Sequence, residues 1–79
     1  MLEALLNVIE ICGSQAELAR RLDAIGAKQE SPITCGSGHV WAWVNRDKKV
    51  SEIWARHCEA AVGGAVTRYE LRPDIFGVV

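Results

Sequence analysis

Apolar residues recur at helical spacing at the start of the chain. They are Leu2, Leu5, Leu6, Ile9 and Cys12. This spacing predicts an amphipathic helix over Leu2–Cys12, and Gly13 is expected to end it because glycine is a common helix terminator.

A second helix is expected directly afterwards. Ser14 and Glu17 have the spacing of a capping box, in which the serine hydroxyl accepts from the Glu17 amide and the Glu17 carboxylate reaches back. The helix is predicted to run from Gln15 to about Leu22. Its expected core residues are Leu18, Ala19 and Leu22, and its expected outward residues are Arg20 and Arg21.

No hydrophobic period persists over residues 23–36. Glycines and a proline interrupt this stretch, although Ser31-Pro32 suits the first turn of a short helix. We therefore expect an extended turn. A loop of this length inside a small domain is often functional.

Helical character returns at Ser37 and is expected to end in the polar run Asp47-Lys48-Lys49. The expected inward residues are Val40, Trp43 and Val44, with Trp41 and Asn45 on another face. A buried face and a separate outward face within one helical stretch together predict a third amphipathic helix.

The last part of the chain predicts a fourth helix and a short tail. Ser51 is expected to cap the helix, which ends near Val62. The residues available for the core are Ile53, Trp54, His57, Cys58, Ala61 and Val62. In the tail, Thr67 and Glu70 repeat the capping-box spacing, and Pro73 is expected to prevent a longer helix.

These elements predict an all-α fold in a single domain, residues 1–79. The second and third helices have the features of a helix-turn-helix. Ala19 supplies a small residue where the two helices approach, and Val40 and Trp43 supply the apolar anchors of a recognition helix. The outward face of that helix would then enter the major groove of DNA, which is wide enough to admit a helix.

The chain also resembles a known family. The matching stretches are GSQAELARRL at 13–22, GHVWAWVNRDKKV at 38–50 and GGAVTRYELRPDIFG at 63–77, and they cover about half of the sequence. On these residues the chain is similar to the Cro-like repressors of the YdaS type, which occur in prophages and their toxin–antitoxin-like regions. The resemblance implies a small lambda-repressor/Cro-like helix-turn-helix domain with an extended turn and a short C-terminal tail. It implies sequence-specific binding of double-stranded operator DNA by a dimer, and repression of transcription.

The resemblance also implies a set of DNA-binding residues. Gln15, at the start of the scaffold helix, matches a position that contacts backbone phosphate. The others are Ser37, Gly38, Trp41 and Asn45 on the recognition helix, and Arg46, Lys48 and Lys49 in the segment after it. Two features depart from the pattern. The turn is about eleven residues longer than the shortest helix-turn-helix spacing, and the recognition face has few of the Gln, Asn and Arg side chains that read base edges.

Each of these residues also has a structural interpretation. Trp41 can pack in the core or at a dimer contact, and Ser37 can cap its helix. Gln15 can be a solvent-facing first helical residue, and Lys48 and Lys49 can belong to a solvated loop. The residue types alone leave these alternatives open.

Composition places the chain among small globular domains. It has 79 residues, of which 49% are hydrophobic and 24% charged. No apolar run approaches the ~18 residues of a membrane span. The N-terminal segment lacks a basic region and a small-residue cleavage site, so we expect no signal peptide, no membrane association and a cytoplasmic location.

Net charge gives DNA binding little support. The formal charge is −1, whereas repressors usually carry a basic face that neutralises phosphates. Arg46, Lys48 and Lys49 are nevertheless clustered, while Glu3 and Glu10 lie near the start of the chain. One face can therefore be positive although the whole chain is not.

Cysteine and histidine do not predict a metal site. Cys12 is expected to be a buried thiol, like the other two cysteines, because no CxxC pair occurs. A zinc site built from Cys35, His39, His57 and Cys58 is the alternative, but its spacing matches no recurrent zinc module. We expect both histidines to be structural, and no cofactor.

The remaining expectations concern partners and catalysis. A protein-interaction module that binds a toxin or host factor is the alternative function, favoured by the acidic balance, the long turn and the paired tryptophans. We expect no enzyme, since His57 and Cys58 are adjacent on a helix and do not face each other. The expected dimer surface is the apolar tail, with packing onto the chain's own core as the alternative. Its residues are Leu71, Ile75, Phe76, Val78 and Val79.

Overall fold

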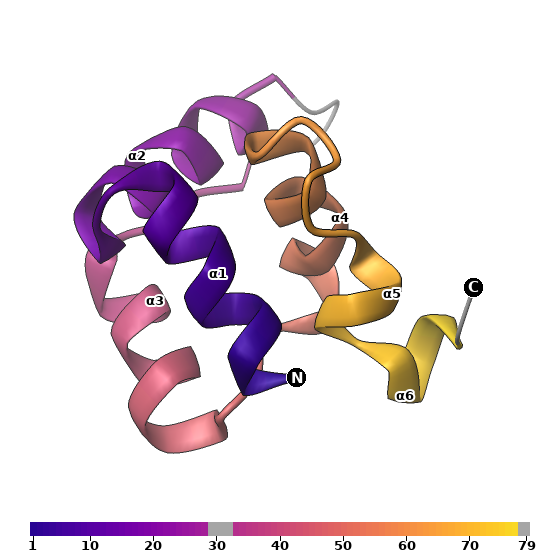
Figure 1. Ribbon diagram of the computed structural model, residues 1–79. Helices are drawn as coiled ribbons and strands as arrows, with labels where there is room; N and C mark the ends of the chain where they lie inside the picture. The colour runs from indigo at the N-terminus through magenta and orange to yellow at the C-terminus, as the bar shows by residue number, and fades with distance from the viewer. Residues whose placement is uncertain (29–32, 78–79) are drawn as a thin grey trace.

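The described part of the chain folds into helices (Figure 1). A computed structural model describes residues 1–28 and 33–77. Within these ranges there are six α-helices, no strand, and one π-helical segment. The elements are α1 (Leu2–Cys12), α2 (Gln15–Gly26), α3 (Ser37–Ala42), η1 (Trp43–Asp47), α4 (Glu52–Ala61), α5 (Arg68–Leu71) and α6 (Pro73–Phe76). The all-α prediction is therefore confirmed.

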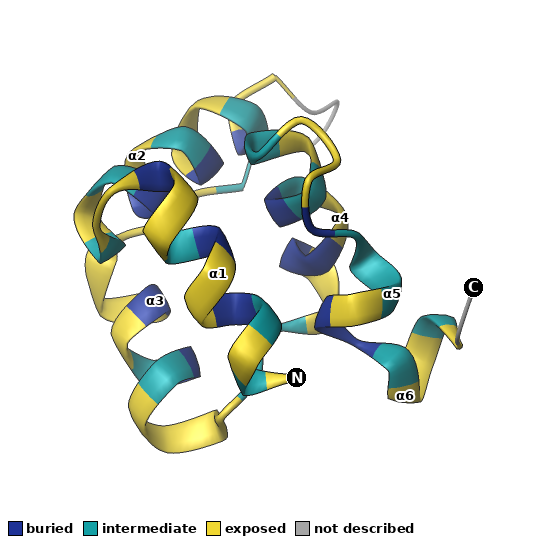
Figure 2. Ribbon diagram, viewed as in Figure 1, coloured by how far each residue is buried: buried dark blue, intermediate teal, exposed yellow. Residues whose placement is uncertain are grey.

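Helix α2 is the centre of the packing. It contacts α1, α3 and α4, while α5 contacts α1 and α4. The inward faces of the helices carry the buried positions, as Figure 2 shows. The core residues are Leu5, Val8, Cys12, Leu18, Ala19, Leu22, Cys35, Val40, Trp43, Val50, Trp54, Ala55, Cys58, Val66 and Leu71. The molecule measures 29 × 26 × 21 Å.

The prediction of buried thiols is confirmed. Cys12, Cys35 and Cys58 are all buried, and none forms a disulfide. Burial raises the pKa of Cys35 to about 11 and that of Cys58 to about 12. The thiols therefore stay protonated at neutral pH, as apolar core residues do.

The sequence correctly predicted where α1 and α2 begin, but it predicted too early an end for α2. The Ser14 hydroxyl accepts from the Glu17 amide at 3.1 Å, as predicted. However, α2 continues past Leu22 to Gly26. Gly26 is buried, and a side chain there would collide with the Ile33 carbonyl. The helix is longer because its last turn packs against residues distant in the sequence. The Ser31-Pro32 turn lies outside the described residues.

Two predictions about α4 and its neighbours were wrong, and a third was only partly right. Ile53 does not enter the core but is 65% exposed, because Trp54, Ala55 and Cys58 define the buried face of α4. Arg21 does not point freely outward, since its guanidinium donates to the Ala61 carbonyl at 3.1 Å and so connects α2 with the end of α4. Ser51 stands at the N-cap of α4, but its side chain makes no capping hydrogen bond.

The tail is attached to the rest of the fold by a buried arginine. Thr67 and Glu70 form the predicted capping box, and Pro73 is the first residue of α6. Arg72 donates to the Val50 carbonyl at 2.9 Å and to the Asp74 carboxylate. Leu71, expected at the dimer surface, is fully buried in the core.

No helix in the described ranges has the length and apolar character needed to cross a membrane.

Candidate nucleic-acid interface

Helix α3 continues into η1, so that residues 37–47 form one helical stretch. Val40 and Trp43 are buried, which confirms them as the inward stripe. Trp41 lies on the opposite side and is 59% exposed. This stretch packs against α2, and its outward face is open to solvent (Figure 2).

The start of α3 is open on its outward side. Ser37 is the first residue of the helix rather than its cap. The capping role belongs to His39, whose Nδ1 accepts from the Gly36 amide at 3.0 Å. This hydrogen bond places the His39 proton on Nε2. Gly38 is exposed, and a Cβ at this position would meet no atom within 4 Å.

Asn45 lies one turn after Trp41 on the same outward face. Its Nδ2 donates to the Trp41 carbonyl at 3.0 Å, which holds the amide against the helix. One Nδ2 proton and the Oδ1 acceptor remain available, and these are the groups that an asparagine uses to read adenine. The outward face thus presents an indole and a partly used amide.

The helix ends at a residue in the left-handed region. Lys48 has a φ of 59°, the only positive φ at a non-glycine among the described residues. The Trp43 carbonyl accepts from the backbone amides of both Lys48 and Lys49. This termination turns the chain sharply and leaves the Lys48 side chain exposed. Two lysines next to a helix C-terminus also complement the helix dipole.

The cations of this segment differ in how free they are. Arg46 pairs with Asp47 at 3.0 Å, and this hydrogen bond holds the pKa of Asp47 below its usual range. Lys49 is half-buried, and its charge adds to the lowering of the pKa of both Asp47 and Asp74. Lys48 forms no ion pair with any described residue. It is therefore the cation of this segment most accessible to an anionic partner.

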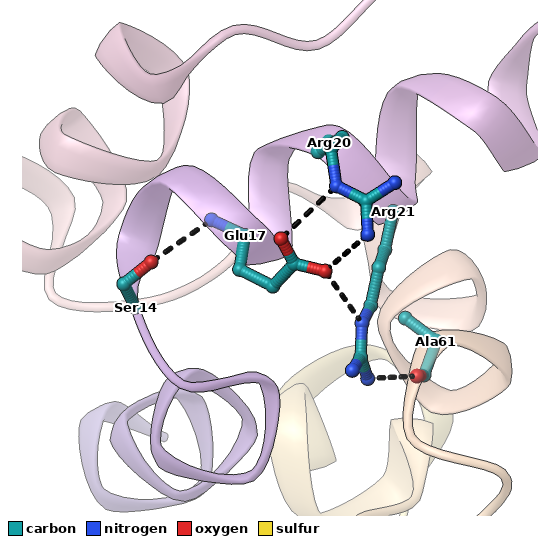
Figure 3. Close-up of polar contacts among 5 residues, drawn as sticks. All are labelled: Ser14, Glu17, Arg20, Arg21 and Ala61. Carbon is teal, nitrogen blue, oxygen red and sulfur yellow. Dashed lines mark hydrogen bonds and ion pairs between the residues drawn. The ribbon is translucent and has the colours of Figure 1, made fainter.

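Gln15 is contributed by the first turn of α2 and is half-buried. The Glu17 carboxylate in the same turn pairs with Arg20 and, at 3.5 Å, with Arg21, instead of reaching back to Ser14 (Figure 3). The hydrogen bond from Arg20 lowers the pKa of Glu17. The carboxylate is thus neutralised by both arginines, and Arg21 in turn binds the Ala61 carbonyl.

The structure therefore brings most of the predicted residues onto one face. Ser37, Gly38, Trp41 and Asn45 are exposed on the stretch that packs on α2, and Arg46, Lys48 and Lys49 follow at its end. Gln15 comes from α2 itself. The capping role of His39 was not predicted from the sequence, although its position three residues after Gly36 is the signal that indicates it.

The four residues of the alternative zinc site have other neighbours and other roles in the structure. His39 is exposed and occupied in capping, while Cys35 and Cys58 are buried in the core. The His57 ring packs edge-on against Trp54, with 5.1 Å between ring centroids. Over residues 1–28 and 33–77, no three His, Cys, Asp or Glu side chains are grouped to hold a metal ion.

Comparison with known proteins adds one finding. Neither the curated proteins nor the solved structures gave a match to this chain. A family model described as bacterial toxin YdaS matches residues 5–79, which is nearly the whole length. The chain therefore belongs to the YdaS toxin family.

Proposed function

We propose that this chain is a cytoplasmic, non-enzymatic transcription regulator that binds operator DNA through the outward face of α3 and η1. In this proposal α2 is the scaffold helix and residues 37–47 are the recognition helix of a helix-turn-helix with an extended turn. The observation that carries the proposal is the division of this stretch, which buries Val40 and Trp43 and exposes Trp41.

The outward face suits shape and apolar contact more than dense base reading. The exposed indole of Trp41 has the size and polarity to lie against a thymine methyl group or a deoxyribose. Gly38 allows the DNA backbone to approach the helix closely, because no side chain stands there. Asn45 contributes one amide proton and one acceptor to a base edge.

Phosphate contact falls mainly to Lys48. The charge of the neighbouring Arg46 is offset by its ion pair with Asp47, and the charge of Lys49 acts on Asp47 and Asp74. The slope of log Kobs against log salt concentration becomes steeper by about 0.9 for each phosphate that the protein neutralises. Because few cations are free, we expect the affinity for DNA to depend only modestly on salt. Gln15 adds an uncharged phosphate contact at the start of α2.

The test is fluorescence anisotropy of a labelled duplex from upstream of the chain's own gene, measured over a range of salt. Lys48→Ala is expected to weaken binding to all sequences and to reduce the salt slope by about one. Lys28→Ala removes the same charge from the turn that follows α2 and is the matched control. Equal effects of the two substitutions would contradict the assignment of Lys48.

A second measurement addresses the recognition face itself. Trp41→Ala leaves the core untouched, since the indole is 59% exposed, so stability is expected to change by less than about 0.5 kcal/mol. Affinity for the preferred duplex is expected to fall at least tenfold. A variant with normal affinity would refute the placement of α3 against DNA.

A protein-interaction module is the second candidate function. It is favoured by the same exposed indole, and by the ion pairs of Arg46 with Asp47 and of Arg20 with Glu17, which offset two of the cations that phosphates would need. Tryptophan is enriched at the centres of protein interfaces. Co-purification of a protein partner through Trp41, together with no DNA binding at low salt, would favour this function over DNA binding.

The family description names a bacterial toxin, and the DNA-binding proposal gives an expectation for toxicity. If the chain inhibits growth on overproduction, inhibition is expected to require the DNA-binding face. Trp41→Ala and Lys48→Ala should then relieve inhibition at equal protein level, whereas Lys28→Ala should not.

A further inference from the structure

Helix α4 presents an apolar residue with no neighbour to cover it. Ile53 is 65% exposed, the highest value for any large hydrophobic side chain in the described ranges. Beside it lies an open hollow of about 320 Å³, lined by Glu52, Ile53, Arg56, His57 and Phe76. A projecting apolar side chain and a hollow of suitable character therefore occur on the same face.

Three of the residues that line the hollow are His57, Arg56 and Phe76. Both ring nitrogens of His57 are buried and have no hydrogen-bond partner among the described residues. The Arg56 guanidinium lies over the Phe76 ring, 5.5 Å from its centroid. A second hollow of about 270 Å³ continues on the other side of Arg56, lined by Ile25, Arg56, His57 and Ala60.

The charges on this face are arranged so that the face complements itself. Glu52 and Arg56 are one helical turn apart and both exposed, but no ion pair joins them in the described chain. A two-fold axis at a level midway between Glu52 and Arg56 would place Glu52 of each copy opposite Arg56 of the other. The same operation brings each Ile53 toward the hollow of the facing copy.

We infer that the outward face of α4 is the self-association surface of this protein, and that its occupant is α4 of a second copy in antiparallel orientation. The inference deepens the proposed function, on which it rests, by naming the partner that completes a two-site DNA binder. It also replaces the tail as the main interface. Leu71 is in the core, Phe76 lines the hollow on α4, and Val78 and Val79 lie outside the described residues.

The expected self-association is weak in solution. The chain exposes 4650 Å² in total, and a standard interface of about 800 Å² per partner would take roughly a sixth of it. A contact centred on one ten-residue helix buries less. Two copies held on adjacent DNA sites gain effective concentration, so binding to a two-site duplex is expected to be cooperative.

The first test is sedimentation velocity over a wide range of protein concentration, without DNA. Ile53→Asp is expected to raise the dissociation constant of the dimer at least tenfold, because it replaces a buried apolar contact by a charge. Leu6→Asp makes the same change at an exposed position of α1 and is the control. A wild-type chain that stays monomeric at every concentration, or a dimer equally sensitive to Leu6→Asp, would overturn the inference.

The second test exchanges the charges. Glu52→Arg and Arg56→Glu are each expected to weaken self-association, because like charges then face each other across the axis. An equimolar mixture of these two variants restores opposite charges and is expected to associate more tightly than either alone. A mixture no tighter than the separate variants would contradict the antiparallel arrangement. Circular dichroism checks that each variant keeps its helices.

The outcome separates this inference from the proposed function. If Ile53→Asp abolishes association but a single-site duplex is still bound, both proposals stand. If the wild type associates through α4 and binds no DNA, the proposed function alone fails. If DNA binds cooperatively and Ile53→Asp changes neither association nor cooperativity, the α4 surface alone fails.

Discussion

Replacing Gly26 by alanine is expected to destabilise the fold, although alanine is the better helix former. Gly26 is the last residue of α2 and is buried against two distant residues. A Cβ at this position would lie 2.4 Å from the Ile33 carbonyl oxygen and 3.0 Å from Cη2 of Trp54. The first distance is shorter than real Cβ contacts, and the atom it meets is backbone.

The magnitude follows from three opposing contributions. Alanine gains about 0.5–1 kcal/mol over glycine inside a helix. Overpacking of a closed site costs about 1–3 kcal/mol. Moving Ile33 also weakens the 3.2 Å hydrogen bond from its amide to the Gly26 carbonyl, in a class of bond worth about 0.5–1.5 kcal/mol. The net loss is about 2 kcal/mol, or roughly 8–16 °C in Tm for a domain of this size.

The assay is urea unfolding followed by tryptophan fluorescence, since Trp43 and Trp54 are both in the core. Gly38→Ala is the matched control. Gly38 is exposed within α3, and a Cβ there meets nothing, so this substitution is expected to stabilise by about 0.5–1 kcal/mol. A Gly26→Ala chain as stable as the wild type would refute the steric reasoning. A loss of stability in Gly38→Ala would refute the open surface at the start of α3.

Further predictions concern the tail and the end of η1. Arg72→Ala leaves the Val50 carbonyl unpartnered and is expected to cost about 2 kcal/mol in urea unfolding, whereas Arg72→Lys is expected to lose less. Asp74 has its pKa lowered by the Arg72 hydrogen bond, so its contribution to stability is present above the ordinary aspartate pKa and is lost as pH falls through the lowered value. Asp74→Asn should therefore flatten the decline of stability in acid, and an unchanged acid profile would argue against the pair. Lys48→Gly removes the strain of a left-handed backbone conformation at a non-glycine residue, so the free energy of unfolding is expected to rise by up to about 1 kcal/mol. The same variant is expected to bind DNA more weakly because it lacks the cation. A variant with unchanged stability and unchanged affinity would contradict both roles of Lys48.

Helix caps and helical faces could be predicted from the sequence because they depend on residues only a few positions apart. The Ser14 and Thr67 caps depend on a side chain and an amide three positions away, and both form. Val40 and Trp43 follow from helical spacing, and both are buried. The exposure of Ile53 was not predicted; Ala55 and Cys58 define a buried side of α4 that excludes it.

Features that depend on distant residues could not be read in this way. The last turn of α2 exists because Gly26 meets Ile33 and Trp54, and the sequence does not show that contact. Arg21 was predicted to face outward because the sequence does not show that the end of α4 brings the Ala61 carbonyl within hydrogen-bond distance of it.

The candidate site shows the same division. Helical spacing correctly placed Trp41 and Asn45 on a face separate from the core. It could not show that Lys49 lies within the field of Asp74, because α6 brings that carboxylate from far along the chain. The number of free cations, and hence the expected salt dependence, is therefore a result of the tertiary structure.

Hydroxyl-radical footprinting of the region upstream of the chain's own gene shows whether the outward face of α3 and η1 binds DNA. We expect the protein to protect two patches of the duplex about one helical turn, ~34 Å, apart. Protection should be lost with Trp41→Ala at a concentration where that variant is fully folded. Uniform cleavage in the presence of folded wild-type protein at low salt, or an unchanged footprint with Trp41→Ala, would contradict DNA binding through this face.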